Sequence, residues 1–198
     1  MSLFKKNKIA DNGKPAKKSK RTFPPIAIAR KMLSEHAQSE VLGSRARAAI
    51  SQLAELERVR EASDDIVADR FGYASITYGK FSTAIDEASK VVCANCRELS
   101  SKMDLFDVAE YKRLNSTIAL IDAGSRNEDR EALADRLALL DTALDKLDET
   151  SEMNKAIIAG INRLSKDIAD SATGDGDIAA EIKSLVEELP RYTEALSD

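Results

Sequence analysis

The chain contains no proline between Ile26 and Leu189, and this interval constrains the fold more than any other feature. Proline breaks helix interiors, so its absence over such a distance favours helices throughout. Apolar residues recur along the interval at spacings of three and four, and Gly43, Gly72 and Gly124 separate the periodic segments. Hydrophobic residues make up 43% of the chain, which is enough for a core. The sequence predicts an all-α fold, a multi-helix bundle of about five to seven amphipathic helices in one domain from residue 23 to residue 198.

A leucine-rich run from residue 125 to residue 168 is the most regular of these segments. Its leucines follow spacings of four, three, four and three, typical of a helix packed along one seam, at Leu133, Leu137, Leu140, Leu144 and Leu147. Leu139 and Ala143 widen this face beyond what a two-stranded coiled coil requires, so we expect it to be buried as the central helix pair of the bundle. The seam is interrupted at Ser151 and Asn154 and resumes three residues out of register at Ile157. The run is therefore either one bent helix or two.

Capping residues predict where several helices begin. Ser125 and Glu128 have the spacing of a capping box at the start of the leucine-rich run. Asp104 is expected to cap the helix that precedes this run, and Asp177 is expected to cap a final helix. Because proline interrupts helices, the final helix is expected to end before Pro190.

An acidic flank lies on the other side of the leucine seam. It consists of five carboxylates, Asp141, Asp145, Asp148, Glu149 and Glu152. Like charges four residues apart cost an isolated helix about 0.2–0.5 kcal/mol per pair, and a cationic partner would relieve that cost. The flank is therefore a candidate face for a basic partner, and the alternative is a solvated surface without a partner.

The first 22 residues carry eight basic groups against one acidic group, a net charge of +7, whereas the remaining residues carry 22 basic and 33 acidic groups, a net charge of −11. With no sustained apolar period, residues 1–22 are predicted to form a disordered basic arm. Its candidate anion-binding residues are Lys5, Lys6, Lys8, Lys14, Lys17, Lys18, Lys20 and Arg21. Leu3 and Phe4 could add an apolar contact with a membrane. Candidate receivers are an anionic membrane, nucleic acid or an acidic protein face such as the flank, and a solubilising tail remains the alternative.

The sequence shows no constellation for catalysis or metal binding. Cys93 and Cys96 fall in mid-helix rather than at a helix start, and with the single His36 they fall short of the four ligands of a structural zinc site, so they are predicted to be packing residues. The acidic segment from Asp170 to Glu181 lacks oxygen ligands and the glycine where a calcium loop needs them. We expect no enzyme activity, no cofactor, no metal and no small-molecule substrate.

Two segments carry a family resemblance. The first runs from Ile76-Thr77-Tyr78 to Met103, and the second is the final segment Gly176-Asp177-Ile178-Ala179-Ala180-Glu181-Ile182-Lys183-Ser184-Leu185. Their order, with the leucine-rich helix between them, resembles the bacterial XpaC-like helical proteins over about the last two-thirds of the chain. The resemblance implies an accessory helical protein, of the kind associated with toxic-anion-resistance proteins of the TelA type, and it implies no catalytic residue here.

These features predict a non-enzymatic adaptor or assembly protein that acts through contacts with a protein partner, which includes a second copy of the chain. One alternative is a peripheral assembly protein of the membrane surface, because the charge layout resembles that of PspA-like proteins. A second is a nucleic-acid accessory protein, although the arm has one aromatic residue and no arginine-rich helix, which argues against specific recognition. No apolar run approaches the ~20 residues of a spanning helix, so we expect a cytoplasmic protein, with attachment to the inner membrane face as the alternative.

Overall fold

The computed structural model describes residues 23–121, 127–170 and 175–194. The basic arm and the capping box at Ser125 therefore lie outside the described residues, as does Gly124. Six helices account for most of the described chain: α1 (Pro24–Ser34), α2 (Gly43–Phe71), α3 (Ile76–Leu105), α4 (Val108–Leu120), α5 (Asn127–Asp170) and α6 (Asp175–Glu194). The described residues contain no strand, which confirms the all-α prediction.

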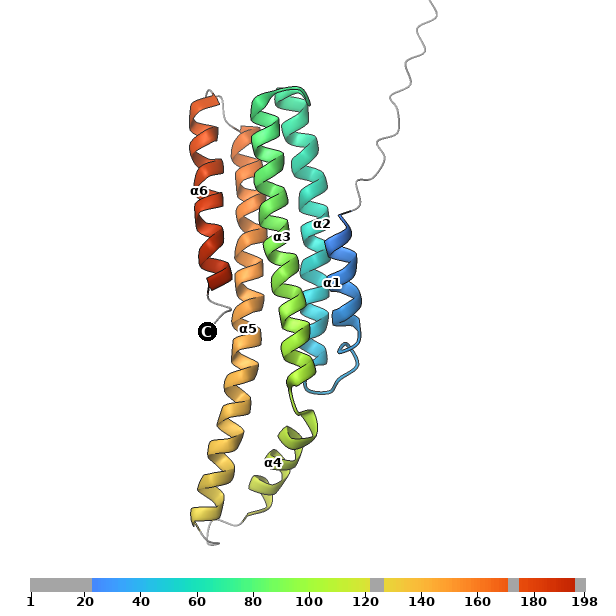
Figure 1. Cartoon of the computed structure of the whole chain (residues 1–198), viewed down its shortest axis with the longest axis vertical. Helices are drawn as coiled ribbons and strands as arrows, with labels where there is room; N and C mark the ends of the chain where they lie inside the picture. Colours follow the sequence, from blue (N-terminus) through green and yellow to red (C-terminus); the bar gives the residue numbers. More distant parts are fainter. Residues whose placement is uncertain (1–22, 122–126, 171–174, 195–198) are drawn as a thin grey trace, which may run out of the picture.

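The long helices α2, α3 and α5 run side by side, with α6 against α3 and α5 and the short α1 against α2 and α3 (Figure 1). At about 1.5 Å per residue, the 30-residue α3 is ~45 Å long and the 44-residue α5 is ~66 Å long. Because of this difference, α5 continues past the ends of α2 and α3, and α4 lies beside its extension (Figure 1).

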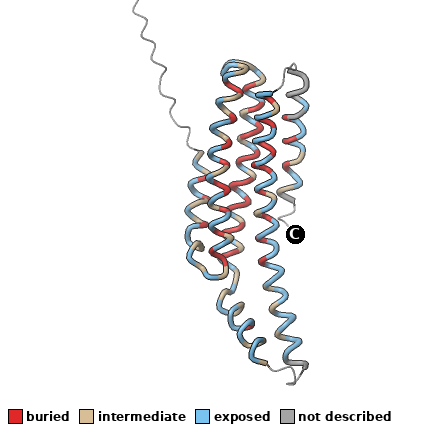
Figure 2. Tube along the Cα trace, turned by 180° about the vertical axis from the view of Figure 1, so that it is seen from behind, coloured by how far each residue is buried: buried red, intermediate tan, exposed pale blue. Residues whose placement is uncertain are grey.

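The core lies between α2, α3 and α5, as the band of buried residues in Figure 2 shows. Its largest buried side chains recur at helical spacing, for example Phe81 and Leu99 on α3 and Ile157 and Ile161 on α5. Each such side chain stabilises the fold by about 1.5–3 kcal/mol when it leaves water. None of the helices in the described part of the chain is both long enough and apolar enough to cross a bilayer.

Local sequence fixes the turns between the helices. Gly72 ends α2 as predicted, with a φ of 74° that residues with a Cβ rarely adopt. The Ser75 hydroxyl caps α3 by accepting a hydrogen bond from the backbone N–H of Tyr78. The predicted cap at Asp104 is wrong: α3 continues through Asp104 to Leu105, and Asp107 caps α4 by accepting from the backbone N–H of Glu110 at 2.8 Å.

From residue 127 onward the leucine-rich run forms a single helix, α5, rather than two helices. Its seam is covered unevenly. Leu144 and Leu147 are buried, whereas Leu139 is 73% exposed and Ala143 is exposed. The expectation that the widened face is buried in the bundle is therefore wrong for the first part of α5, because α2 and α3 do not reach it.

The final helix differs from its prediction at both ends. It begins at Asp175, so Asp177 lies inside it rather than at its cap, and it continues through Pro190 to Glu194. Proline in a helix interior costs about 3 kcal/mol. Leu189 is buried beside Pro190 and Tyr192 packs against the core, and this apolar burial offsets the cost.

Candidate protein-interaction site

The most unusual part of the molecule is the extension of α5 beyond the bundle, together with α4, which packs against it. We call α4 together with residues 130–143 of α5 the α4–α5 projection. Two side-chain contacts hold its helices together: the Arg136 guanidinium lies 2.9 Å from the Glu110 carboxylate, and the Tyr111 hydroxyl donates to Asp141 at 3.1 Å. The hydrogen bond from Arg113 lowers the pKa of Glu110, so this carboxylate stays charged near neutral pH. The projection is therefore an ordered helix pair.

One helix cannot enclose the leucine seam of another. Leu114 on α4 is buried, but Leu133, Leu137 and Leu140 on α5 are only half-buried. Two leucines that flank α4 in the sequence are exposed as well: Leu105 at the end of α3 is 86% exposed and Leu120 at the end of α4 is 84% exposed. Figure 2 shows the contrast between this part of the molecule and the buried core. A leucine seam that only one helix covers is typical of a surface that binds another helix.

The exposed face of the projection is continuous with the core. Ala143, Thr150, Ile157 and Leu164 lie on one side of α5, because seven residues make nearly two helical turns. Thr150, Ile157 and Leu164 are at most 5% exposed, whereas Ala143 is exposed, and so is Leu139 one turn earlier. The same face of α5 thus passes from buried to exposed at the side of the bundle where α2 begins and α3 ends (Figure 1). A helix placed beyond these ends would continue the core.

The acidic flank is partly paired within the chain. Arg45 on α2 donates to both carboxylate oxygens of Asp148, at 2.9 and 2.6 Å, in the bidentate geometry that is strongest for this pair. Asp141 accepts from Tyr111, and burial followed by this hydrogen bond raises the pKa of the Tyr111 hydroxyl. These two carboxylates therefore fasten α5 to its neighbours, a role that the sequence pattern did not reveal.

The other carboxylates of the flank face solvent. Glu152 pairs with Lys155 one turn away, at 2.6 Å, which relieves its charge locally. Asp145 and Glu149 are exposed and make no ion pair with another described residue. Of the five carboxylates of the flank, Asp145 and Glu149 are therefore the two that could still pair with a basic partner.

Polar side chains pair in the core, at positions that the apolar periodicity does not predict. Asn95 Nδ2 donates to Asn154 Oδ1 at 2.9 Å, and the hydroxyls of Ser63 and Ser165 lie 2.5 Å apart. Gln52 donates to Ser151 Oγ at 2.7 Å. The signal in the sequence was the interruption of the leucine seam at Ser151 and Asn154. These pairs join α2 and α3 to α5 and fix which residues meet, because a shift in register would leave buried polar groups without partners.

Both cysteines are buried, which confirms their predicted place among the packing residues. Each is 0% exposed, and burial raises the pKa of Cys93 to about 11 and that of Cys96 to about 12. Thiols with such pKa values stay protonated near neutral pH and are poor nucleophiles. Within the described ranges, no group of three or more His, Cys, Asp or Glu side chains could hold a metal ion.

His36 lies in the segment between α1 and α2. Its Nε2 is 3.3 Å from Asp104 Oδ1. The contact joins this segment to the last turn of α3.

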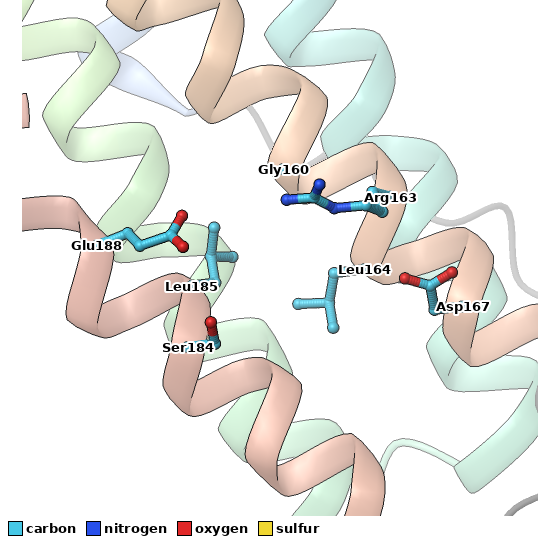
Figure 3. A pocket seen from close by; sticks show the side chains of 7 residues that line it. All are labelled: Gly160, Arg163, Leu164, Asp167, Ser184, Leu185 and Glu188. Carbon is cyan, nitrogen blue, oxygen red and sulfur yellow. The ribbon is translucent and has the colours of Figure 1, made fainter.

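A cavity of ≈ 210 Å³ lies between α5 and α6. Arg163 and Asp167 on α5 face Glu188 on α6 across Leu164 and Leu185, with Gly160 and Ser184 at its edges (Figure 3). Pockets for organic ligands usually measure about 300–1,000 Å³. The cavity is below that range, and its charged side chains offer no nucleophile with a positioned base.

Comparison with protein families, with curated proteins and with solved structures found no match. The resemblance to XpaC-like proteins therefore stays a prediction of the sequence.

Proposed function

We propose that the chain is a non-enzymatic helical adaptor or assembly protein, and that it binds a protein partner through the α4–α5 projection. One observation carries the proposal: the apolar face of α5 continues past the bundle and ends exposed at Leu139 and Ala143. A solvated helix would place polar residues there. Binding a helix of another chain would remove this face from water.

The proposal is tested by photo-crosslinking in cells that express the full chain. A photoreactive phenylalanine analogue replaces Leu139, and a matched variant carries it at Ile76, which is 79% exposed at the far end of the bundle. We expect a covalent adduct with another polypeptide from position 139 and none from position 76. Equal labelling at both positions, or no adduct at position 139, would refute the proposal.

A second candidate, a peripheral assembly protein on an anionic membrane, is favoured by the charge of the arm. Each basic residue near an anionic leaflet contributes about 1 kcal/mol, so a net charge of +7 could hold the protein at such a surface. Flotation with vesicles that contain or lack anionic lipid tests this idea on the full chain and on a chain without residues 1–22. Flotation that does not depend on both the arm and the anionic lipid would contradict it. Retardation of DNA or RNA at physiological salt would instead favour the nucleic-acid alternative.

A further inference from the structure

We propose that the partner of the α4–α5 projection is a second copy of this chain, packed antiparallel so that two projections form a four-helix bundle. This inference rests on the proposed function and names its partner. Three properties of the projection support it: the order of side chains along its exposed stripe, its charge and its size.

The exposed stripe on α5 is self-complementary. It consists of Ala132, Arg136, Leu139 and Ala143, all exposed, with successive spacings of four, three and four. This series reads the same in both directions, so a twofold axis between Arg136 and Leu139 places each residue opposite a stripe residue of the second copy. Ala132 then meets Ala143, and Leu139 meets the aliphatic stem of Arg136. Small residues at both ends let the two helices approach closely.

The charge of the projection permits this contact. Its described residues 108–120 and 130–143 carry four basic and four acidic groups, so the projection is neutral. The whole of residues 23–198 carries 22 basic and 33 acidic groups, a net charge of −11. Two copies would therefore repel each other over most of their surfaces but not at the projection. The charge of Arg136 is partly offset at the stripe, because its guanidinium lies 2.9 Å from Glu110, a carboxylate that it shares with Arg113.

The size of the projection matches a weak, reversible dimer. The 13 residues of α4 span about 20 Å, and two helices side by side are about 20 Å wide, which gives a face of roughly 400 Å² before side-chain ridges are counted. Stable complexes bury about 800 Å² of accessible surface on each partner, and weaker encounters bury less. We therefore expect a monomer–dimer equilibrium whose dimer fraction rises with protein concentration.

The first test measures the mass of the full purified chain by sedimentation equilibrium over a concentration series. We expect the unmodified chain to form a reversible dimer. Leu139→Glu should raise the dissociation constant of this dimer by at least about tenfold, and Ile76→Glu should leave it unchanged. Both side chains are largely exposed, so neither variant should lose helix content, and far-UV circular dichroism checks this. A monomer at every concentration, or a dimer that Leu139→Glu does not weaken, would overturn the inference.

The second test examines the antiparallel arrangement by disulfide formation between two differently tagged chains. Mixing Ala132→Cys with Ala143→Cys should give the mixed disulfide faster than either variant gives its own, since only the mixed pair meets across the axis. The native cysteines are buried and add little background. Preferential formation of the self-paired disulfides would show a parallel contact and contradict the proposal.

The two proposals can fail separately. If the chain is monomeric but the probe at position 139 crosslinks a different protein, the partner is not a second copy and the proposed function stands. If position 139 gives no adduct and the chain is monomeric, both are wrong.

Discussion

Replacing either member of the buried Asn95–Asn154 pair by alanine should give unequal losses of stability. Asn95 Nδ2 donates to Asn154 Oδ1, and Asn154 Nδ2 donates to Cys96 Sγ at 3.4 Å. Asn95 Oδ1 is buried and has no hydrogen-bond partner among the residues that the structure describes, so within them the pair is satisfied on one side only. Both asparagines are 0% exposed, and the cavities left by the two truncations are comparable.

The inequality follows from a count of the buried polar atoms left without a partner. Asn95→Ala removes one orphaned oxygen and creates another, Asn154 Oδ1, so its main costs are one hydrogen bond and a cavity. Asn154→Ala removes the same bond and also the bond to Cys96 Sγ, and it leaves both polar atoms of the Asn95 amide unpaired. Because each buried unpaired group costs about 1–3 kcal/mol, Asn154→Ala should destabilise the protein by about 1–3 kcal/mol more than Asn95→Ala.

Urea unfolding followed by far-UV circular dichroism measures both free energies, and the double variant completes the cycle. We expect a coupling energy between the two asparagines of at least about 0.5 kcal/mol, as for residues in direct contact. Equal losses for the two single variants, or a larger loss for Asn95→Ala, would refute the assignment of Asn95 Oδ1 as the unpaired atom.

Three further predictions concern single positions. Leu147→Ala, in the bundle, should lower the unfolding free energy by about 2–5 kcal/mol, and Leu137→Ala, in the projection, should cost clearly less in the same urea titration. Gly79→Ala should raise the thermal midpoint of unfolding, because a Cβ there meets nothing within 4 Å and alanine favours the helix over glycine by about 1 kcal/mol. Gly43→Ala should lower the thermal midpoint, because its Cβ would lie 2.8 Å from a backbone oxygen. Burial raises the pKa of Cys96 from 9.0 to about 12 and that of Cys93 to about 11, so the native chain should lose stability as pH rises above 9.0, by up to about 1.4 kcal/mol per pH unit for each thiol. Cys96→Ala should keep only the loss from Cys93, so its stability should fall less steeply with pH, and parallel pH profiles would contradict this.

The sequence predicts the helical faces well because the periodicity of apolar residues reports directly on which side of a helix avoids water. It placed Leu144 and Leu147 in the core, and it identified the end of α2 at Gly72. Cys93 and Cys96 followed from the same logic, since thiols inside a periodic helix are small apolar residues.

Periodicity does not show which neighbour covers an apolar face. The seam at Leu137 has the same spacing as the seam at Leu147, yet only the latter lies opposite α2 and α3. The partners that bury residues of α5 come from far earlier in the chain: Asn95 precedes Asn154 by 59 residues, and Gln52 precedes Ser151 by 99. The continuation of α6 through Pro190 has a related cause, because the burial of Leu189 outweighs the local cost of a proline in a helix.

The pairing of α2 with α5 also determines when the core can form during synthesis of the chain. Arg45 meets Asp148 across 103 residues, and Ser63 meets Ser165 across 102. At about 5–20 residues per second, a ribosome needs roughly 5–20 s to supply the second member of each pair. During that time α2 and α3 can pair locally, but the side they will share with α5 stays in water. The apolar faces of α2 and α3 that later contact α5 therefore stay exposed on the nascent chain for seconds, and a chaperone could bind them in that interval.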